Sequence, residues 1–511
     1  MKTLDPRLKR LDESRVSITN PHGISATLFA NSNVPVEPSA VTELLEMLEV
    51  SETLREVAKA QPDAFDQPPS IEAVAVTPDF HKAKGIPVGT VIATKGFSIP
   101  QAVGNDINCG MRLHVTSLSA EDVYRHRDEL ETEFRRIYFE GGRNIPMQRV
   151  QREAMFRNGL TGLLETTPRS QTEGQWAEFH QCDWSKELSC VDRRGSLKAN
   201  SVFGLDDFMG PPDRMTRDGQ IGSIGGGNHF VEIQVVDRVI DGTTAHAWGL
   251  KAGAVTVMVH SGSLSIGHLC GNYFRDVVRQ LHPELLKHPA NGIFLLPGGG
   301  RNREQAELFR DSVNNAGNFA FANRLFLGLM AITGLKRICG DLESKLVYDA
   351  PHNFLWSEEV DGVETVIHRK GACPARGFEA MAGTPFEYFG EPVLVPGSMG
   401  ASSFVLAGRG NQESLCSASH GAGRMLSRGE AQHGHEAEFQ EFLERFRVVT
   451  PVDFRRADVR QRRDIYEKKM DEIRQEAPYA YKGIGAIIQT LTDASIASPV
   501  AELTPLMTMK G

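Results

Sequence analysis

The chain has 511 residues, 40% of them hydrophobic and 24% charged, with a formal net charge of −9. Its length predicts two to four domains or one large core with insertions, and its composition is that of an ordinary globular protein. The negative charge argues against non-specific coating of nucleic acid as the main activity, although 56 Lys and Arg residues leave room for a local basic channel. No apolar run approaches the roughly 20 residues of a membrane-spanning helix, so no membrane partner is expected.

The cysteine content predicts a reducing compartment. Seven cysteines is an odd number with no Cys-x-x-Cys pair, which argues against a disulfide framework and a zinc ribbon; they are Cys109, Cys182, Cys190, Cys270, Cys339, Cys373 and Cys416. The N-terminal residues are charged and lack the apolar stretch of a secretory signal. We therefore expect a cytoplasmic protein.

The first half of the chain predicts a helix, then strands, then a second helix. Residues 37–60 have the apolar spacing of a helix that Ser39 would cap. Residues 71–103 alternate short apolar runs with turns, which is typical of strands, and residues 121–138 are charged and helical. Residues 140–220 are Arg-rich, contain several prolines and have few periodic apolar positions. We expect a peripheral insertion there.

The second half alternates strands and helices. Residues 255–259 and 393–396 predict strands, 303–330 a long helix, and 436–446 and 459–473 charged helices. The fold class is therefore mixed α+β. We expect an N-terminal helical extension over residues 1–70, and a single large catalytic core over residues 71–511. Central β-structure flanked by helices would form this core, with the insertion at about 140–220.

The run from Gly104 to Arg112 places a carboxylate and a thiol three residues apart between glycines, at Asp106 and Cys109. A cysteine that binds metal must ionise, and a nearby cation lowers its pKa enough to do so. Asp106 could then reach a second cation that shares the sulfur. The alternative is a glycine-rich turn with a buried cysteine.

Four histidines lie at strand ends or glycine turns: His229, His260, His352 and His420. Any one of them alone is more often a hydrogen-bonded core histidine. Together with the Asp-Cys pair they predict two metal ions bridged by the thiolate, or one metal ion and a catalytic histidine. Thiolate and imidazole favour Zn, Fe or Cu, whereas the carboxylate favours Mn or Mg.

Further motifs accompany these residues along the chain. In order they are Pro78-Asp79-Phe80-His81, Lys84-Gly85-Ile86-Pro87-Val88-Gly89, Asp106-Ile107-Asn108-Cys109-Gly110, Gly227-Asn228-His229-Phe230-Val231-Glu232, Val259-His260-Ser261-Gly262-Ser263, His352-Asn353, Arg369-Lys370-Gly371-Ala372, Pro396-Gly397-Ser398-Met399-Gly400, His420-Gly421-Ala422-Gly423-Arg424, Glu476-Ala477-Pro478 with Tyr481-Lys482, and Lys510-Gly511. In combination they resemble the RtcB family of GTP-dependent RNA ligases, over most of residues 70–130 and 220–511.

The resemblance implies a mechanism. Cys109 would bridge two Mn²⁺ ions, with Asp106 and His229 completing one site and His260 and His352 the other, and Zn²⁺ is the alternative metal. His420 would attack the α-phosphorus of GTP and form a histidine-GMP adduct. The GMP would pass to an RNA 3′-phosphate, which a 2′,3′-cyclic phosphate yields on opening. A 5′-hydroxyl would then displace GMP, in tRNA splicing or RNA repair.

The resemblance also implies binding residues and partners. The nucleotide would contact Asn228, Glu232, Ser398, Ser403, Gly421, Ala422, Gly423, Tyr481 and Lys510. RNA phosphates would bind Lys370, Arg424 and Arg428. The implied partners are RNA ends, and the sequence leaves open whether an archease-type activator takes part.

The sequence departs from the family pattern in four places, which leaves its substrate open. Leu264 stands where the family typically has an arginine that could contact phosphate, and Pro351 stands where a second histidine is frequent. The run His81-Lys82-Ala83-Lys84 replaces a more usual aromatic-containing turn, and the expected insertion at 140–220 is unlike typical members. A divergent paralogue that caps 3′-phosphate ends with GMP and joins them poorly is one alternative. A binuclear metal phosphoesterase and a non-catalytic RNA-end-binding subunit are others, but neither needs a nucleophilic His420.

Overall fold

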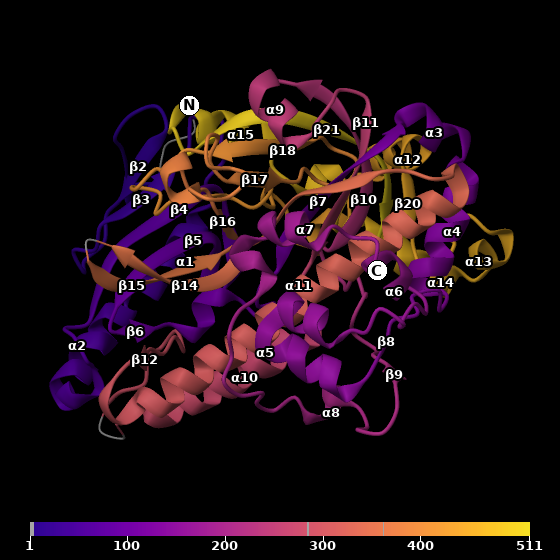
Figure 1. Cartoon of the computed structure of the whole chain (residues 1–511). Helices are drawn as coiled ribbons and strands as arrows, with labels where there is room; N and C mark the ends of the chain where they lie inside the picture. Colours follow the sequence, from indigo (N-terminus) through magenta and orange to yellow (C-terminus); the bar gives the residue numbers. More distant parts are fainter. Residues whose placement is uncertain (1–4, 284–285, 361) are drawn as a thin grey trace.

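Two large β-sheets form the centre of the molecule (Figure 1). The computed structural model describes residues 5–283, 286–360 and 362–511. A seven-stranded sheet has the order β1 (Leu8–Arg10), β2 (Arg15–Ile18), β3 (Ala26–Phe29), β4 (Ser70–Lys84), β5 (Ile86–Lys95), β15 (Val363–Lys370) and β14 (Asn353–Val360). Its strands pair antiparallel except for β3 and β4, which are parallel.

An eight-stranded sheet carries most of the candidate ligands. Its order is β13 (Ser344–Pro351), β7 (Gly110–Ser119), β11 (Ala254–Ser261), β10 (Phe230–Val239), β21 (Ala497–Met509), β18 (Ser403–Gly408) and β17 (Pro392–Val395), with β20 (Arg447–Val449) parallel to β21. Two-stranded ladders join β12 (Leu296–Pro297) to β6 (Phe97–Ser98), β16 (Ala372–Pro374) to β19 (Ser417–Ser419), and β8 (Pro146–Met147) to β9 (Thr216–Arg217).

Helices pack against both sheets. They are α1 (Pro38–Leu48), α2 (Val50–Ala60), α3 (Ala120–Arg125), α4 (Arg127–Phe139), α5 (Arg149–Thr166), α6 (Trp176–Phe179), α7 (Trp184–Ser189), α8 (Asp206–Met209), α9 (Gly242–Trp248), α10 (Leu264–Leu281), α11 (Arg303–Cys339), α12 (Glu436–Arg445), α13 (Ala457–Gln461), α14 (Arg463–Arg474) and α15 (Ile484–Asp493). The predicted mixed class, with central β-structure flanked by helices, is confirmed.

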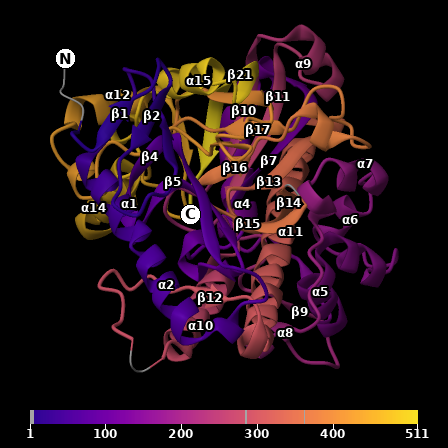
Figure 2. The ribbon, with the colours of Figure 1, turned by 90° about the vertical axis from the view of Figure 1, so that its left-hand side faces the viewer.

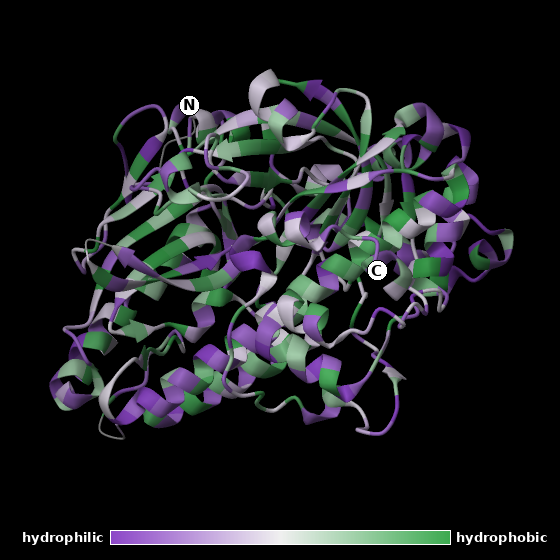
Figure 3. Ribbon diagram, viewed as in Figure 1, coloured by the Kyte–Doolittle hydropathy of each residue, from purple (hydrophilic) through white to green (hydrophobic). Residues whose placement is uncertain are grey.

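The long helix α11 runs through the molecule with α5 beside it (Figures 1 and 2). It packs on β7 and β11. Hydrophobic residues are distributed along α11 and along the strands (Figure 3). The sequence predicted no apolar run of membrane-spanning length. Residues Gly300–Cys339 nevertheless have that length and composition, but 94% of the apolar window is buried inside the fold, as in a core helix.

The N-terminal 70 residues contain strands as well as the predicted helices. β3 pairs with β4, so this segment extends the seven-stranded sheet and is not purely helical. The helix predicted over residues 37–60 is two helices, α1 and α2, which meet at Glu49. Ser39 lies inside α1, whose N-cap is Glu37.

Residues 140–220 do not form the peripheral segment that the sequence predicted. Met155, Phe156, Leu160 and Trp176 belong to the main hydrophobic cluster, and α5 packs against α11. The sequence showed no regular helical spacing of apolar residues here because α5 is interrupted at Gly159, which has non-helical backbone angles. Whether this segment is an insertion stays a prediction.

All seven cysteines lie in described parts of the chain and are free of disulfide bonds.

β4 runs from Ser70 to Lys84 and includes Pro78. Its pairing with β5 shifts between Val76 and His81, which is a bulge. A bulge re-aims the side chains within it, and this one carries Asp79.

Candidate functional site: a thiol and imidazole pocket between the sheets

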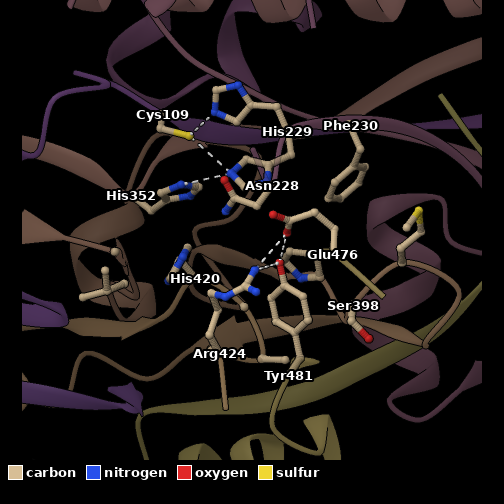
Figure 4. Close-up of a pocket in the computed structure, with 18 of the residues that line it drawn as sticks. Cys109, Asn228, His229, Phe230, His352, Ser398, His420, Arg424, Glu476 and Tyr481 are labelled. Atoms are coloured by element: carbon tan, nitrogen blue, oxygen red, sulfur yellow. Dashed lines mark hydrogen bonds and ion pairs between the residues drawn. The ribbon is translucent and has the colours of Figure 1, made fainter. Parts of the chain in front are cut away.

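One pocket of about 320 Å³ collects the predicted site residues from both sheets (Figure 4). Its wall includes His81 and Val88 from β4 and β5, and Phe230 from the start of β10. Of the predicted residues it brings together Asp106, Cys109, Asn228, His229, Glu232, His260, His352, Lys370, Ser398, His420, Gly421, Ala422, Gly423, Arg424, Arg428, Tyr481 and Lys510. Ser403 is the exception. Its buried hydroxyl accepts from Gln234 Nε2 at 3.0 Å and lies behind the pocket wall.

The Cys109 sulfur is common to two groups of metal-binding atoms. Asp106, Cys109 and His229 form one group, and Cys109, His260 and His352 form the other, with the atoms of each group within 4.8 Å of one another. Cys109 Sγ lies 3.2 Å from both His229 Nε2 and His260 Nε2. His260 Nε2 lies 3.3 Å from His352 Nε2.

These separations fit ligands that share an ion. In a tetrahedral Zn²⁺ site, bond lengths of about 2.0–2.3 Å place two nitrogens about 3.3 Å apart, and sulfur and nitrogen about 3.5 Å apart. His229 Nδ1 lies 3.1 Å from Ile224 O, which fixes the ring proton on Nδ1. The Nε2 lone pair therefore faces Cys109 Sγ and, at 2.9 Å, Asp106 Oδ2. The lone pairs of His229 Nε2 and Asp106 Oδ2 repel each other unless a cation lies between them.

The Asp106 carboxylate is held from one side only. Oδ1 accepts from the backbone N–H of Leu264 at 2.8 Å and from the Ser263 hydroxyl at 3.2 Å. Oδ2 has no hydrogen-bond donor, although it is buried. An ionised oxygen without a donor is costly to bury, so this atom too fits a bound cation.

Burial sets the protonation of the ligand set. It lowers the pKa of His260 and of His352 well below 6.5, so both rings are neutral and have lone pairs available. Burial also raises the pKa of the Cys109 thiol well above 9.0, and the charge of Asp106 raises it further. The thiol is therefore protonated in the empty protein, and a metal ion would displace its proton.

His420 lies next to this cluster, just after β19. Its ring centre is 4.7 Å from that of His352, and its Nδ1 donates to Asp79 Oδ2 at 2.6 Å. The Thr77 hydroxyl donates to Asp79 Oδ1 at 2.5 Å. Burial alone would raise the pKa of Asp79, but the charge that His420 carries when protonated and the hydrogen bonds from His420 and Thr77 lower it overall. The proton on Nδ1 leaves Nε2 of His420 with a lone pair.

The turn after His420 requires glycine. Gly423 has a φ of +73°, and a Cβ there would lie 2.4 Å from the backbone oxygen of Asp79. The absence of a side chain thus lets the chain that carries His420 approach the bulge that carries Asp79. The two residues are 341 positions apart in sequence.

Lys510 directly follows β21, and Glu232 lies on β10, the strand that pairs with β21 in the eight-stranded sheet. The Lys510 ammonium donates to the backbone oxygens of Gly227 and His229, and burial lowers its pKa to about 8. Burial raises the pKa of Glu232 to about 7, and its carboxylate accepts from Thr508 and Gln234. The C-terminal lysine is therefore ordered, with its ammonium against the glycine-rich turn before β10.

Glu476 links three of the predicted binding residues. Its carboxylate accepts from the Tyr481 hydroxyl and, at 3.2 Å, from Arg424, whose guanidinium carbon lies 5.1 Å from the Tyr481 ring centre. Arg428 lies 3.6 Å from Glu476, and its side chain is 59% exposed. Lys370 donates to Ile86 O at 2.5 Å, and burial lowers its pKa to about 8. Of the three predicted RNA-binding residues, Arg428 is therefore the one whose side chain is most free to contact a ligand.

Sequence reasoning quoted Asp79 and Glu476 within motifs but gave neither a role. For Asp79 the available signal was a carboxylate directly after an apolar run. For Glu476 the signal was an acid five positions before Tyr481 in a short polar segment. Neither signal identifies the distant partner, which is His420 for Asp79 and Arg424 for Glu476, because only the fold brings these residues close.

Comparison with known proteins identifies the family of the chain. The family model described as tRNA-splicing ligase RtcB matches residues 63–511. A protein named tRNA-splicing ligase RtcB from Thermococcus kodakarensis is 31% identical, over 99% of both chains. Proteins of the same name from Methanococcus maripaludis (30% identical over 88% of this chain and 92% of that protein) and Pyrobaculum aerophilum (31% over 85% and 87%) are also similar.

The chain therefore belongs to the RtcB family. The resemblance that the motifs indicated is confirmed.

Proposed function

We propose that this chain is a GTP-dependent RNA ligase that joins 3′-phosphate or 2′,3′-cyclic phosphate ends to 5′-hydroxyl ends through a histidine-GMP adduct. Membership of the RtcB family supports the RNA ligase class. The observation that carries the finer proposal is the Cys109 thiol, shared by two ligand groups and adjacent to His420. tRNA splicing, named for the relatives, and repair of broken RNA are the settings we propose, in the cytoplasm.

The ligand groups support two divalent ions. Asp106, Cys109 and His229 would hold one, and Cys109, His260 and His352 the other. Bound ions would offset charge on the phosphoryl oxygens. We propose Mn²⁺, with Zn²⁺ as the alternative, because thiolate and imidazole bind Zn²⁺ tightly and availability decides between them.

His420 is the proposed nucleophile. Asp79 holds the proton on Nδ1, so the Nε2 lone pair is free to form a bond to the α-phosphorus of GTP while the bond to pyrophosphate breaks. An oxygen of the RNA 3′-phosphate then attacks the same phosphorus and breaks the bond to Nε2. In the last step the 5′-hydroxyl attacks the RNA phosphate, loses its proton and releases GMP. A cyclic phosphate is first opened by water.

The pocket wall supports binding sites for both substrates. Asn228, Glu232 and Lys510 surround the glycine-rich turn and are proposed to bind GTP with Ser398, Gly421, Ala422, Gly423 and Tyr481. Lys370, Arg424 and Arg428 are proposed to bind RNA phosphates. Ser403 would act only through Gln234, whose amide it accepts from.

Leu264 favours a second candidate function, in which 3′-ends are capped with GMP and joined poorly. A Cβ on Gly225 would lie 2.5 Å from a Leu264 methyl carbon, so this side chain packs on the glycine-rich turn and offers no donor to phosphate. An RNA end that lacks this contact would still accept GMP but would be held less firmly for the joining step.

Covalent labelling tests the adduct. The protein is incubated with α-labelled GTP and Mn²⁺ and then denatured, and label is expected on the wild type and not on His420→Ala. His246→Ala is the matched control, because His246 is an exposed residue of α9 outside the pocket. A wild type that stays unlabelled but hydrolyses phosphoesters would overturn the proposal in favour of a binuclear phosphoesterase.

Joining is tested with two oligonucleotides, one ending in a 3′-phosphate and the other in a 5′-hydroxyl. The ligase predicts joined product, whereas the second candidate predicts a GMP-capped 3′-end that accumulates. Under the second candidate, Leu264→Arg is expected to raise the ratio of joined to capped RNA. An unchanged ratio in that variant would remove Leu264 as the explanation.

A further inference from the structure

One turn of α11 carries polar side chains that are fully buried in a largely apolar helix. Asn323 and Arg324 are both 0% exposed, between Phe321 and Leu325. Burying a guanidinium and an amide is costly unless their donors and acceptors are all paired. Their partners therefore indicate what this turn holds in place.

Arg324 contacts three of the segments that carry candidate ligands. Its Nη1 donates to the backbone oxygens of Asn108 at 2.6 Å and Ser261 at 3.2 Å, and its Nη2 donates to Asn108 Oδ1 at 3.0 Å. Its Nε donates to Asp349 Oδ1 at 2.9 Å. Asn108 precedes Cys109, Ser261 follows His260, and Asp349 stands three positions before His352.

Asn108 needs such support because its backbone is strained. It has a φ of +56°, which is uncommon for a residue other than glycine. The guanidinium binds its backbone and side-chain oxygens together, and Asn108 Nδ2 donates to Gly317 O on α11 at 2.8 Å. α11 thus holds Asn108 in place, and Asn108 in turn sets the position of the neighbouring Cys109.

Asn323 holds the remaining segment. Its Nδ2 donates to the oxygens of Ser223 at 3.1 Å and Gly262 at 3.2 Å, and its Oδ1 accepts from the backbone of Gly222 at 2.8 Å. Ile224, which follows Ser223, has the backbone oxygen that accepts from His229 Nδ1. Two consecutive residues of α11 therefore hold backbone next to every cluster of candidate ligands.

We propose that Arg324, assisted by Asn323, is the positioning residue of the two-ion site, and that its planar fork sets the separation of Cys109 from His260 and His352. This inference rests on the proposed metal site. Arg324 touches none of the candidate ligand atoms. It acts through the backbone at Asn108 and Ser261 and through Asp349.

A purely structural role makes a different prediction, and the chain offers a matched comparison. Arg112 is also 0% exposed and donates to the same carboxylate, from Nη1 to Asp349 Oδ2 at 3.1 Å. Its other side-chain partners are His114 and Glu187. Arg112 thus shares the burial and the ion pair of Arg324 but does not bind the backbone beside the ligands.

The test titrates Co²⁺, a spectroscopic substitute, into the metal-free full-length protein and follows the near-ultraviolet thiolate band and the visible bands. Arg324→Lys keeps the charge and loses the fork. We expect its Co²⁺ affinity to fall about 10- to 100-fold, as on loss of a group that orients ligands, with an altered thiolate band. Arg112→Lys is expected to bind Co²⁺ within threefold of wild type. Urea unfolding of the metal-free proteins compares their stabilities.

The outcomes separate this inference from the proposed function. A wild type without a thiolate band contradicts the two-ion site itself, and this inference with it. A folded Arg324→Lys with the wild-type spectrum and affinity overturns the positioning role alone, as does an equal loss in both lysine variants. If Arg324→Lys does not fold, Asn108→Gly decides, since glycine accepts the positive φ but loses both side-chain hydrogen bonds. Wild-type Co²⁺ affinity in Asn108→Gly would overturn the inference, and a loss of tenfold or more would support it.

Discussion

Replacing Asp79 by asparagine tests whether the nucleophile depends on one tautomer of His420. The carboxylate is fully buried and accepts from His420 Nδ1 at 2.6 Å. A hydrogen bond to a charged group is worth about 1.5–3 kcal/mol, which corresponds to about 10- to 150-fold in rate. An asparagine amide that donates to Nδ1 also moves the ring proton to Nε2 and removes the attacking lone pair. In Ser-His-Asp enzymes that exchange costs about 10⁴-fold.

We therefore expect Asp79→Asn to form the labelled adduct at least about 100-fold more slowly than wild type. The assay is rapid quenching with α-labelled GTP at saturating Mn²⁺, with metal content measured in parallel. Thr77→Val is the control, because it removes the donor to Asp79 Oδ1 and keeps the bond to His420. Adduct formation by a folded Asp79→Asn within threefold of wild type would refute the tautomer argument.

Four further measurements test the site. Cys109→Ser is expected to lose both ions, since Cys109 belongs to both ligand groups; loss of only one ion per chain would contradict the shared thiol. Metal uptake by wild type should release a proton, because burial raises the pKa of Cys109, and calorimetry in two buffers of different ionisation enthalpy would detect it. Burial raises the pKa of Glu232 from 4.5 to about 7, so the folded protein keeps a proton that the unfolded chain releases, and stability falls as pH rises through this window. Glu232→Gln should therefore gain on the order of 2–3 kcal/mol over wild type at pH 8 and little at pH 4.5 in urea unfolding; an equal gain at both pH values would contradict the raised pKa. Gly423→Ala should slow adduct formation at least about tenfold, since its Cβ would meet Asp79 O at 2.4 Å, and a wild-type rate would show that this turn can shift.

Burial has opposite effects on the candidate metal ligands. Burial keeps His260 and His352 neutral, which favours metal binding, and it keeps Cys109 protonated, which opposes it. The proposed ions would resolve this conflict by taking the thiol proton's place. His420, by contrast, has the Asp79 carboxylate as a permanent partner and needs no ion to fix its tautomer.

The amino-acid sequence by itself pointed to the thiol and the imidazoles of the candidate site. Cys109 and the histidines at 229, 260, 352 and 420 could be recognised because thiols and imidazoles beside glycines are visible without coordinates. The long helix over residues 303–330 and the mixed class were also predictable, since periodic apolar spacing is a local property.

Only the tertiary structure decided how these residues act on one another. Asp79 and His420 are 341 positions apart, and their pairing depends on a bulge in one sheet and a glycine turn beside it. Ser403 was expected to contact the nucleotide but does not line the pocket, because strand register decides which residues face a cavity. Arg324 belongs to none of the sequence motifs. Its partners at Asn108, Ser261 and Asp349 are distant in sequence, so no local pattern could have placed it beneath the ligands.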